Sequence, residues 1–347
     1  MKVSKAAAAL LVVSMAAAPA VGAASPRGTY VWPGPDPTSV TSPEALPAAV
    51  REVISAERAA GIQRGCETVV WRHVARPAER GVVILLHGYS AGTWQFDALG
   101  PMLHAAGHDV YAARLVGHGY QREDDEEDSS RLLEAAEWPR YHEFAESVYR
   151  TAATLGGPIS VLAFSAGADV AMAILEAHPD VARAVLIAPF LSPVGGDARL
   201  GVGLARFIDF VTGTGGGAWL DTMPFSWGEA GRPAARAWGR PGHWDMKVGN
   251  VYGLLTFGQD VLAKADRIRT PLQLVSTGAD DVAAEEPIRE LYRRAGGATR
   301  NAHYHFPAAE RVPHPMIHFR ENPDPVSLAK VTAIVRGFLV GGVGANR

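Results

Sequence analysis

The chain has 347 residues, of which 48% are hydrophobic and 20% charged, a composition typical of a soluble globular protein with a large core. Its formal net charge of −3 argues against a nucleic-acid-binding protein. The single cysteine, Cys66, excludes an internal disulfide, so stability must come from the core.

The first 23 residues have the features of a secretory signal peptide. Lys2 and Lys5 give a positively charged start, and the apolar run AAAALLVVSMAAA follows. The run is shorter than the ~20 residues that cross a membrane, which argues against a retained anchor. Val21 and Ala23 satisfy the small-residue rule for cleavage after Ala23. We expect an exported protein, periplasmic or secreted, with no membrane span once residues 1–23 are removed.

Beyond the signal peptide, strand-like and helical patterns alternate along the chain. Residues 24–60 are predicted to form a Pro- and Ser-rich arm that ends in a helix over 47–60. Buried apolar runs predict strands at 68–75, 81–88, 109–115, 159–165, 183–189, 271–278 and 301–306. Helical patterns follow at 141–155, 166–180, 285–295 and 325–339. This alternation predicts an α/β protein with a mostly parallel central sheet and helices on both faces.

A long insert interrupts the sheet after the strand at 183–189. We predict that residues 191–265 form a helical cap, while 61–190 and 266–347 form the core. The insert contains Trp219, Trp227, Trp238 and Trp244. Its apolar residues at helical spacing are Leu200, Leu204, Phe207, Ile208 and Val211, and we expect them to supply an apolar pocket as well as burying the cap.

The stretch VLAFSAGADV, residues 161–170, places one serine between a predicted strand and a predicted helix. Ser165 sits at the carboxyl end of the strand, where open α/β sheets bind their ligands. The pattern A-F-S-A-G differs from the nucleophile elbow G-x-S-x-G only in Ala163. Ala166 and Gly167 keep the other close positions small. The pattern therefore predicts a nucleophilic serine rather than an ordinary turn.

Three stretches in this order make the chain resemble an α/β-hydrolase: LLHGYSAGTWQF, LVGHGYQ and AFSAGA. From about residue 67 to 339 it is similar to bacterial carboxylesterases and to monoacylglycerol-lipase-like lysophospholipases. The resemblance implies an α/β-hydrolase fold and hydrolysis of a small-molecule or lipid ester through an acyl-enzyme intermediate. It implies no cofactor. It also implies that the triad follows the chain order serine, acid, histidine.

The acid of the triad belongs in the loop STGADDVAAEE, where Asp280 and Asp281 both qualify. The Gly-x-x-Asp turn usual in the family, counted from Gly278, selects Asp281. The histidine belongs after the last strand, in RVPHPMIHF. There the flanking prolines favour a loop at His314, while His318 is expected to pack as the chain moves toward the last helix.

The resemblance also implies an oxyanion hole, made by the backbone N–H groups of Tyr89 and of Ala166. His87 is expected to brace the loop before Tyr89. No metal site is predicted: the acidic run at 123–128 lacks the spaced ligands of a calcium loop, and His303 and His305 lack further ligands.

Two other classes of function remain open at this point. The chain is either an active enzyme, as the triad residues suggest, or a non-catalytic binding protein on a hydrolase fold. An acyltransferase or an aminopeptidase uses the same triad, and sequence does not separate transfer of the acyl group from hydrolysis.

Overall fold

The computed structural model describes residues 45–75, 80–121, 128–197, 199, 201–203, 205, 217–226, 238–296 and 301–341. The predicted signal peptide, nearly all of the arm and the acidic run except its last residue lie outside these ranges. Five apolar cap residues that were predicted to supply a pocket, and one tryptophan of the cap, also lie outside the described ranges: Leu200, Leu204, Phe207, Ile208, Val211 and Trp227.

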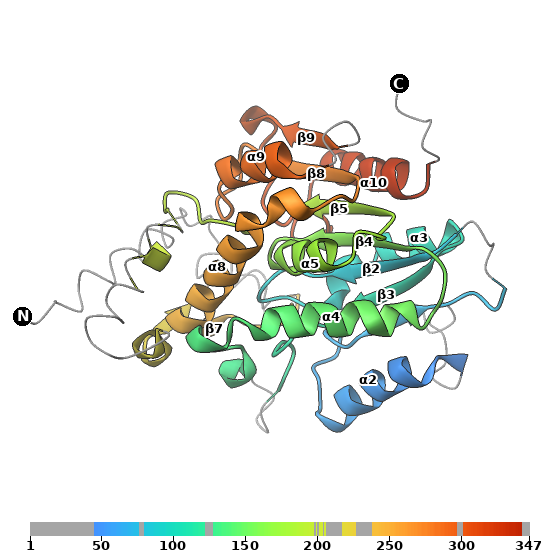
Figure 1. The fold of residues 1–347 in the computed structure, drawn as a ribbon, viewed down its shortest axis with the longest axis horizontal. Helices are drawn as coiled ribbons and strands as arrows, with labels where there is room; N and C mark the ends of the chain where they lie inside the picture. The colour runs from blue at the N-terminus through green and yellow to red at the C-terminus, as the bar shows by residue number, and fades with distance from the viewer. Residues whose placement is uncertain are drawn as a thin grey trace, which may run out of the picture.

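A seven-stranded sheet forms the centre of the molecule, in the order β1-β3-β2-β4-β5-β8-β9 (Figure 1). The strands are β1 (Val69–Trp71), β2 (Val82–Leu86), β3 (Asp109–Ala113), β4 (Ile159–Phe164), β5 (Arg183–Ile187), β8 (Leu272–Thr277) and β9 (Ala302–Phe306). Only β1 pairs in the antiparallel sense, and every other pair in this sheet is parallel. The predicted mostly parallel sheet is confirmed.

The central strands are apolar along their whole length because both faces of the sheet are covered. Every residue of β2 and β4 is buried. Along β2 the side chains of Ile84 and Leu86 join one core cluster, and those of Val83 and Leu85 join the other. The alternation follows from the two-residue period of a strand.

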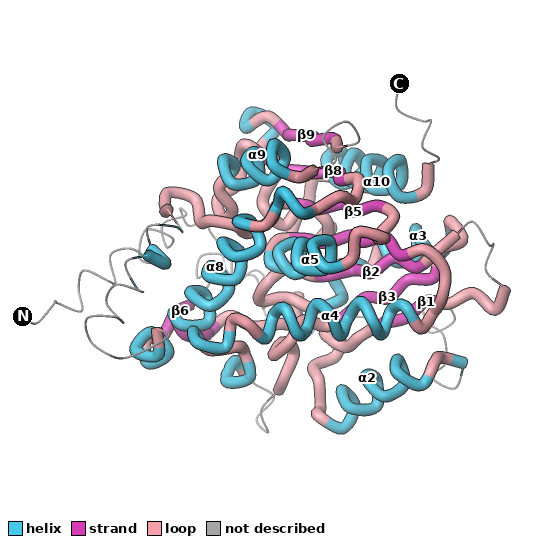
Figure 2. Tube along the Cα trace, viewed as in Figure 1, coloured by secondary structure: helices cyan, strands magenta, loops and turns pink. Residues whose placement is uncertain are grey.

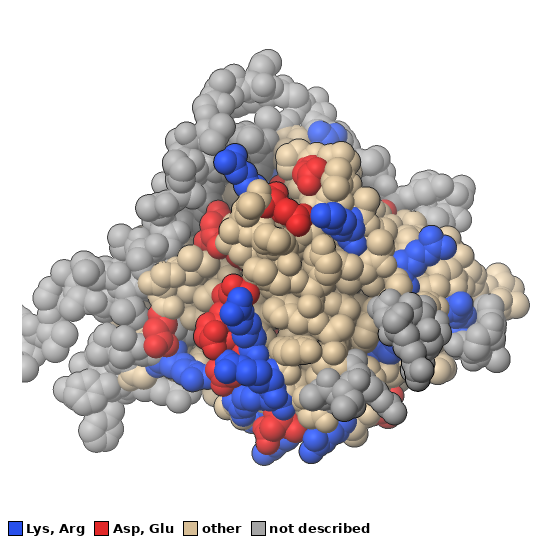
Figure 3. Space-filling view, turned by 90° about the horizontal axis from the view of Figure 1, so that it is seen from above, with Lys and Arg blue, Asp and Glu red and all other residues tan. Residues whose placement is uncertain are grey.

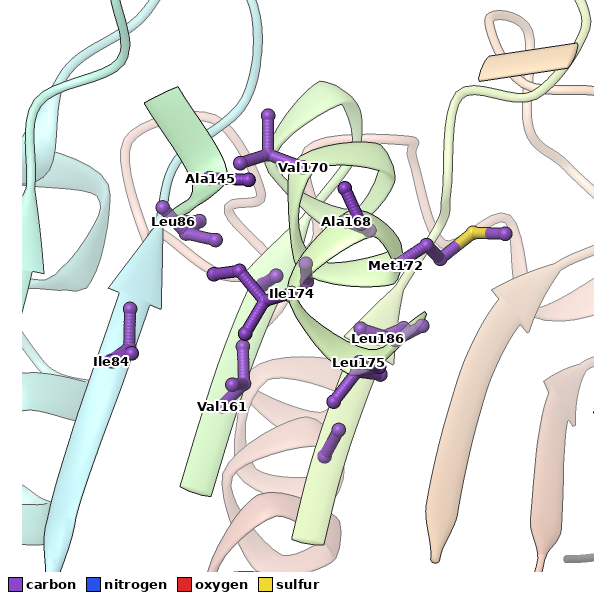
Figure 4. Close-up of a cluster of buried hydrophobic side chains, with 14 of the residues drawn as sticks. Ile84, Leu86, Ala145, Val161, Ala168, Val170, Met172, Ile174, Leu175 and Leu186 are labelled. Carbon is purple, nitrogen blue, oxygen red and sulfur yellow. The ribbon is translucent and has the colours of Figure 1, made fainter. Parts of the chain in front are cut away.

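Helices form a layer on each side of the sheet (Figure 2). One layer contributes to the larger core cluster: α2 (Ala48–Ala59), α4 (Arg140–Ala153), α5 (Ala166–Ala177), α8 (Val248–Ala263) and α9 (Glu285–Arg294). The opposite layer contains α3 (Leu99–Ala105) and α10 (Pro325–Leu339). Figure 4 shows Ile174 and Leu175 of α5 pointing toward Val161 on β4 and Leu186 on β5.

Shorter elements connect these layers. Single turns of 3-10 helix lie at η2 (Thr93–Phe96), η3 (Ser129–Arg131), η4 (Ala135–Glu137), η5 (Ala218–Thr222), η6 (Ala265–Arg267) and η8 (Ala308–Glu310). Inside the insert, β6 (Pro224–Ser226) pairs antiparallel with β7 (Asp245–Lys247). The end of the insert is α8, whose apolar side joins the same core cluster as α5. The division into core and cap stays a prediction.

The described surface carries charges of both signs. On the face drawn in Figure 3, acidic and basic side chains are interspersed and no extended area of one sign is visible. Arg289 and Arg293 of α9, for example, pair with Glu285 and Glu286 of the same helix. Among the described helices, none is both long and apolar enough to cross a membrane.

Candidate active site

Ser165 lies on a sharp turn that joins β4 to α5. Its backbone has φ 54° and ψ −124°, a conformation that L-residues rarely adopt. The turn is held by its own N–H, which donates to the Ile187 carbonyl at 2.9 Å, and by its carbonyl, which accepts from Ala168 N at 2.8 Å. Strain of this kind persists where the surrounding structure enforces it, and it often marks a functional site.

The turn requires small neighbours because the start of α5 lies against the end of β2. A Cβ on Gly167 would come within 2.3 Å of the Leu86 carbonyl oxygen and 2.5 Å of that of His87. Ala163 has room for its methyl group, because it lies in the strand ladder between Leu86 and Leu186 and faces the larger core cluster. Alanine at that position is therefore compatible with the elbow.

His314 reaches Ser165 from the loop after η8, 149 residues further along the chain. Its Nε2 lies 2.9 Å from Ser165 Oγ. The side chain is 7% exposed and packs beside the Phe164 ring, with the ring centroids 5.1 Å apart. The structure thus brings together the predicted serine and histidine.

Asp280, and not the predicted Asp281, is the carboxylate beside this histidine. His314 Nδ1 lies 3.0 Å from Asp280 Oδ1 and 2.9 Å from Oδ2. The N–H groups of Val282 and Ala283 also donate to Oδ1, at 2.8 and 2.7 Å. These three donors fix the carboxylate, whose side chain is 5% exposed.

The prediction of Asp281 is wrong because pairing with a distant segment decides which residue of this loop faces His314. Residues 282–284 pair with 192–194: Val194 N donates to Val282 O at 3.0 Å, and Ala284 N donates to Ser192 O at 2.8 Å. With the chain held there, the turn ends one residue earlier than the Gly-x-x-Asp spacing implies. Asp280 faces His314 and Asp281 is exposed.

The surroundings make His314 more basic than a free histidine. Burial by itself would lower its pKa, because the interior disfavours the imidazolium ion. The charge of Asp280 and its hydrogen bond act in the opposite direction, and the charges of Asp281 and Glu321 add to this effect. The balance raises the pKa of His314 above its ordinary value of 6.5.

Of the two predicted oxyanion donors, Ala166 directly follows Ser165, and Tyr89 lines the same pocket as Ser165. Ala166 is the first residue of α5, where a backbone N–H has no acceptor within the helix. Tyr89 lies in the loop after β2, between Gly88, whose N–H donates to Gln95 Oε1 at 2.9 Å, and Ser90. His87 Nε2 accepts from Leu115 N at 3.0 Å, and its Nδ1 donates to Gly88 O at 2.8 Å, so it braces the loop as expected.

A pocket opens beside Ser165 and His314, with an empty volume of about 580 Å³ that includes open solvent at its mouth. One group of lining side chains is apolar: Phe190, Val251, Leu254 and Val282. The other group is polar or charged: Ser90, Gln95, Arg240 and Glu321. The pocket can therefore take a molecule with an apolar part and a polar part.

The remaining histidines of the sequence analysis lie away from Ser165. His303 and His305 flank Ser276 Oγ at 2.8 and 2.9 Å on the outer strands of the sheet. His318 is 3% exposed and meets the Trp94 ring edge-on, and burial lowers its pKa to about 4. Among the described residues, no three His, Cys, Asp or Glu side chains are grouped so that they could hold a metal ion.

Sequence reasoning missed Gln95, Arg240 and Glu321, which line the pocket. Arg240 Nε lies 3.0 Å from Glu321 Oε1, and the two side chains are 8% and 11% exposed. The residues next to Arg240 and Glu321 in the sequence form no pattern that would indicate that these two charged side chains are buried. The partners stand 81 residues apart, so the sequence carries no signal that pairs them.

Comparisons with known proteins identify the family and the fold. A family model described as serine aminopeptidase, S33, matches residues 77–307. No curated protein matches the sequence. The chain is similar in structure to a monoacylglycerol lipase of Paleococcus ferrophilus (TM-score 0.58, 19% identity, 78% of this chain and 98% of that one).

Two further solved structures give the same result. A carboxyl esterase of Bacillus coagulans is similar with a TM-score of 0.57 and 14% identity, over 79% of this chain and 94% of that one. A monoglyceride lipase of Saccharomyces cerevisiae is similar with a TM-score of 0.55 and 12% identity, over 80% and 91%. At these identities the likeness establishes the fold.

Proposed function

Since the chain belongs to the serine aminopeptidase S33 family of the α/β-hydrolase superfamily, we propose that it is an exported serine hydrolase that cleaves carboxylic esters. The observation that carries the proposal is the buried chain of contacts from Ser165 Oγ through His314 to Asp280, with distances of 2.9 Å at both steps. Export to the periplasm or the medium rests on the signal-peptide features of residues 1–23.

The proposed reaction has two halves. His314 Nε2 takes the proton of Ser165 as Oγ attacks the ester carbonyl carbon, and Asp280 stabilises the imidazolium that forms. The N–H groups of Tyr89 and Ala166 bind the oxyanion. Collapse breaks the bond to the alkoxy oxygen, which receives the proton from His314. Water then attacks the acyl-enzyme by the same route, and the carboxylic acid leaves with Ser165 restored.

The lining of the pocket supports an ester with a medium-length acyl chain. Phe190, Val251, Leu254 and Val282 offer an apolar surface for that chain. The polar lining residues suit the hydroxyl or ester oxygens of the other half of the molecule. A small-molecule or lipid ester with both parts fits these two linings.

An aminopeptidase is the second candidate, because the description of the matching family names that activity. Capture of a free amino terminus needs an unpaired carboxylate in the pocket. Among the described lining residues the only carboxylate is Glu321, and Arg240 already neutralises it. This pairing favours an ester over a peptide with a free amine.

The test is a series of p-nitrophenyl esters of increasing acyl length, assayed beside aminoacyl p-nitroanilides. Ser165→Ala serves as the control in every assay, with fluorophosphonate labelling as a direct readout of the nucleophile. We expect labelling and a maximum at medium acyl length for the wild type, and neither in the variant. A folded wild-type protein that does not label would instead support a binding protein, and faster cleavage of the anilides would favour the aminopeptidase.

A further inference from the structure

The loop of residues 88–90, here called the oxyanion loop, is held from both ends by side chains of the pocket. At one end Gly88 N donates to Gln95 Oε1 at 2.9 Å. At the other end Ser90 O accepts from Arg240 Nη1 at 2.8 Å and from His243 N at 3.0 Å. Tyr89, which carries the proposed oxyanion donor, lies between these two anchors.

Glu321 joins the two anchors into one network. Its Oε1 accepts from Arg240 Nε at 3.0 Å, and its Oε2 accepts from Gln95 Nε2 at 2.8 Å. The path from Ser90 through Arg240, Glu321 and Gln95 to Gly88 therefore closes a ring of hydrogen bonds around Tyr89. The planar guanidinium suits this task because it donates in two fixed directions at once.

The insert approaches the oxyanion loop very closely at this point. Gly242 has φ +120°, and a Cβ there would lie 2.2 Å from Ser90 O. Ser90 itself has φ 62°, so the loop is strained where the insert contacts it. The guanidinium of Arg240 is stacked against two indole rings, 5.3 Å from the Trp94 centroid and 4.9 Å from that of Trp244.

A stability role alone is a poor explanation of this network. Burying an ion pair costs desolvation that the attraction between its partners often fails to recover, so apolar side chains would stabilise the site as well. What the network provides is a fixed direction for the peptide groups on either side of Tyr89. Oxyanion stabilisation depends strongly on such prior placement of the donor.

We propose that Arg240, together with Glu321 and Gln95, is a positioning unit that sets the Tyr89 N–H against the oxyanion. The inference rests on the proposed function and deepens it. It also means that a residue of the insert contributes to the geometry of the reaction and does more than cover the site.

The test compares Arg240→Met with a control, Arg183→Met. Arg183 is the first residue of β5, and Ser165 lies at the other end of the strands, after the carboxyl end of β4. Arg183 Nη1 also donates to backbone carbonyls, those of Phe338 and Gly341, at 2.6 and 2.5 Å. For each protein we would measure Tm, KM and kcat for a p-nitrophenyl ester, with kcat expressed per site titrated by a fluorophosphonate. Titration removes any unfolded fraction from the comparison.

We expect Arg240→Met to lower kcat per titrated site by about 10- to 100-fold. This is less than the roughly 10²–10³-fold loss on deleting an oxyanion donor, since the N–H is displaced and not removed. KM should stay within about twofold of the wild-type value, because the p-nitrophenyl group of this substrate has no hydroxyl for the polar lining to bind. Arg183→Met should lower Tm and leave kcat per site unchanged. Arg240→Lys should fall between wild type and Arg240→Met, because an ammonium lacks the two-directional fork.

If Arg240→Met does not fold, Gln95→Met tests the other end of the ring and should give the same loss in kcat at unchanged KM. Wild-type kcat per site in either folded variant overturns the inference and leaves the proposed function intact. A folded wild type that neither labels nor turns over ester overturns both.

Discussion

Asp280 holds His314 in place with both carboxylate oxygens, at 3.0 and 2.9 Å from Nδ1, while the adjacent Asp281 points into solvent. Two neighbouring residues of the same type therefore have different roles. The first prediction concerns this pair. Asp280→Asn should lower kcat by on the order of 10³–10⁴, because an amide does not stabilise the imidazolium or maintain the right tautomer.

Asp281→Asn is the matched control and should change kcat by less than about threefold at a pH where His314 is neutral, because the exposed Asp281 carboxylate affects the pKa of His314 and does not hold its imidazole. Steady-state kinetics per titrated site measures both variants. A dead Asp281→Asn beside an active Asp280→Asn would contradict the geometry described above.

The two histidines of the last loop provide a second pair. His314→Ala should lower turnover by on the order of 10⁴–10⁶, as expected for loss of a triad member. His318→Ala should retain kcat per titrated site, although its removal leaves a hole against Trp94 and lowers Tm. Thermal unfolding and kinetics on the same samples separate the two effects, and loss of kcat per site in folded His318→Ala would refute this assignment.

The pH dependence follows from the raised pKa of His314. The base must be neutral to accept the proton of Ser165, so kcat/KM should rise with pH through that pKa, above the ordinary value of 6.5. Glu321→Gln should shift the rising limb to lower pH, because the carboxylate contributes to the raised pKa. If the rising limb of kcat/KM in the wild type were centred below pH 6.5, the charges near His314 would not outweigh the effect of burial on its pKa.

Ala163 in the elbow should accept glycine and reject valine. Ala163→Gly should retain activity, since the methyl group serves no chemical role at this position. Ala163→Val adds two methyl groups to a fully buried site between Leu86 and Leu186, and overpacking should cost about 1–3 kcal/mol of unfolding free energy and reduce kcat. Denaturant unfolding and ester turnover check both, and full activity in the valine variant would show that the strand and helix approach less closely.

Asp169 on α5 predicts a pH-dependent stability that is separate from catalysis. The side chain is completely buried, and burial raises its pKa well above the ordinary value. A raised carboxyl pKa means that the folded state holds a proton that the unfolded state releases above ~3.9, so stability falls as pH rises from there to the folded pKa. Asp169→Asn removes this dependence.

We therefore expect the Tm of Asp169→Asn minus that of the wild type to grow as pH increases above about 4. Asp266→Asn, at an exposed carboxylate, is the control and should change Tm little at any pH. A constant difference across pH for Asp169→Asn would show that Asp169 ionises equally in both states.

Local features of the sequence were enough to predict the sheet and the sharp turn at Ser165. The run VVILL has no polar side chain and ISVLAF has only Ser160, so both runs are expected to form central strands buried on both faces. The small residues around Ser165 indicated that the strand and the helix approach closely there. Such a pattern can be recognised from neighbouring positions alone. Helix α3 was not predicted, because its seven residues contain Gly and Pro near the start and give too short a pattern.

Relations between distant segments were decided only by the tertiary structure. Asp280 and Asp281 share one loop and one chemistry, and the choice between them came from the pairing of 282–284 with 192–194. Likewise nothing near Arg240 or Glu321 in the chain indicates that they meet beside Tyr89. Strand formation and a tight turn depend on neighbouring residues. Which carboxylate faces a histidine, or which arginine is buried, depends on segments that folding brings together from far apart.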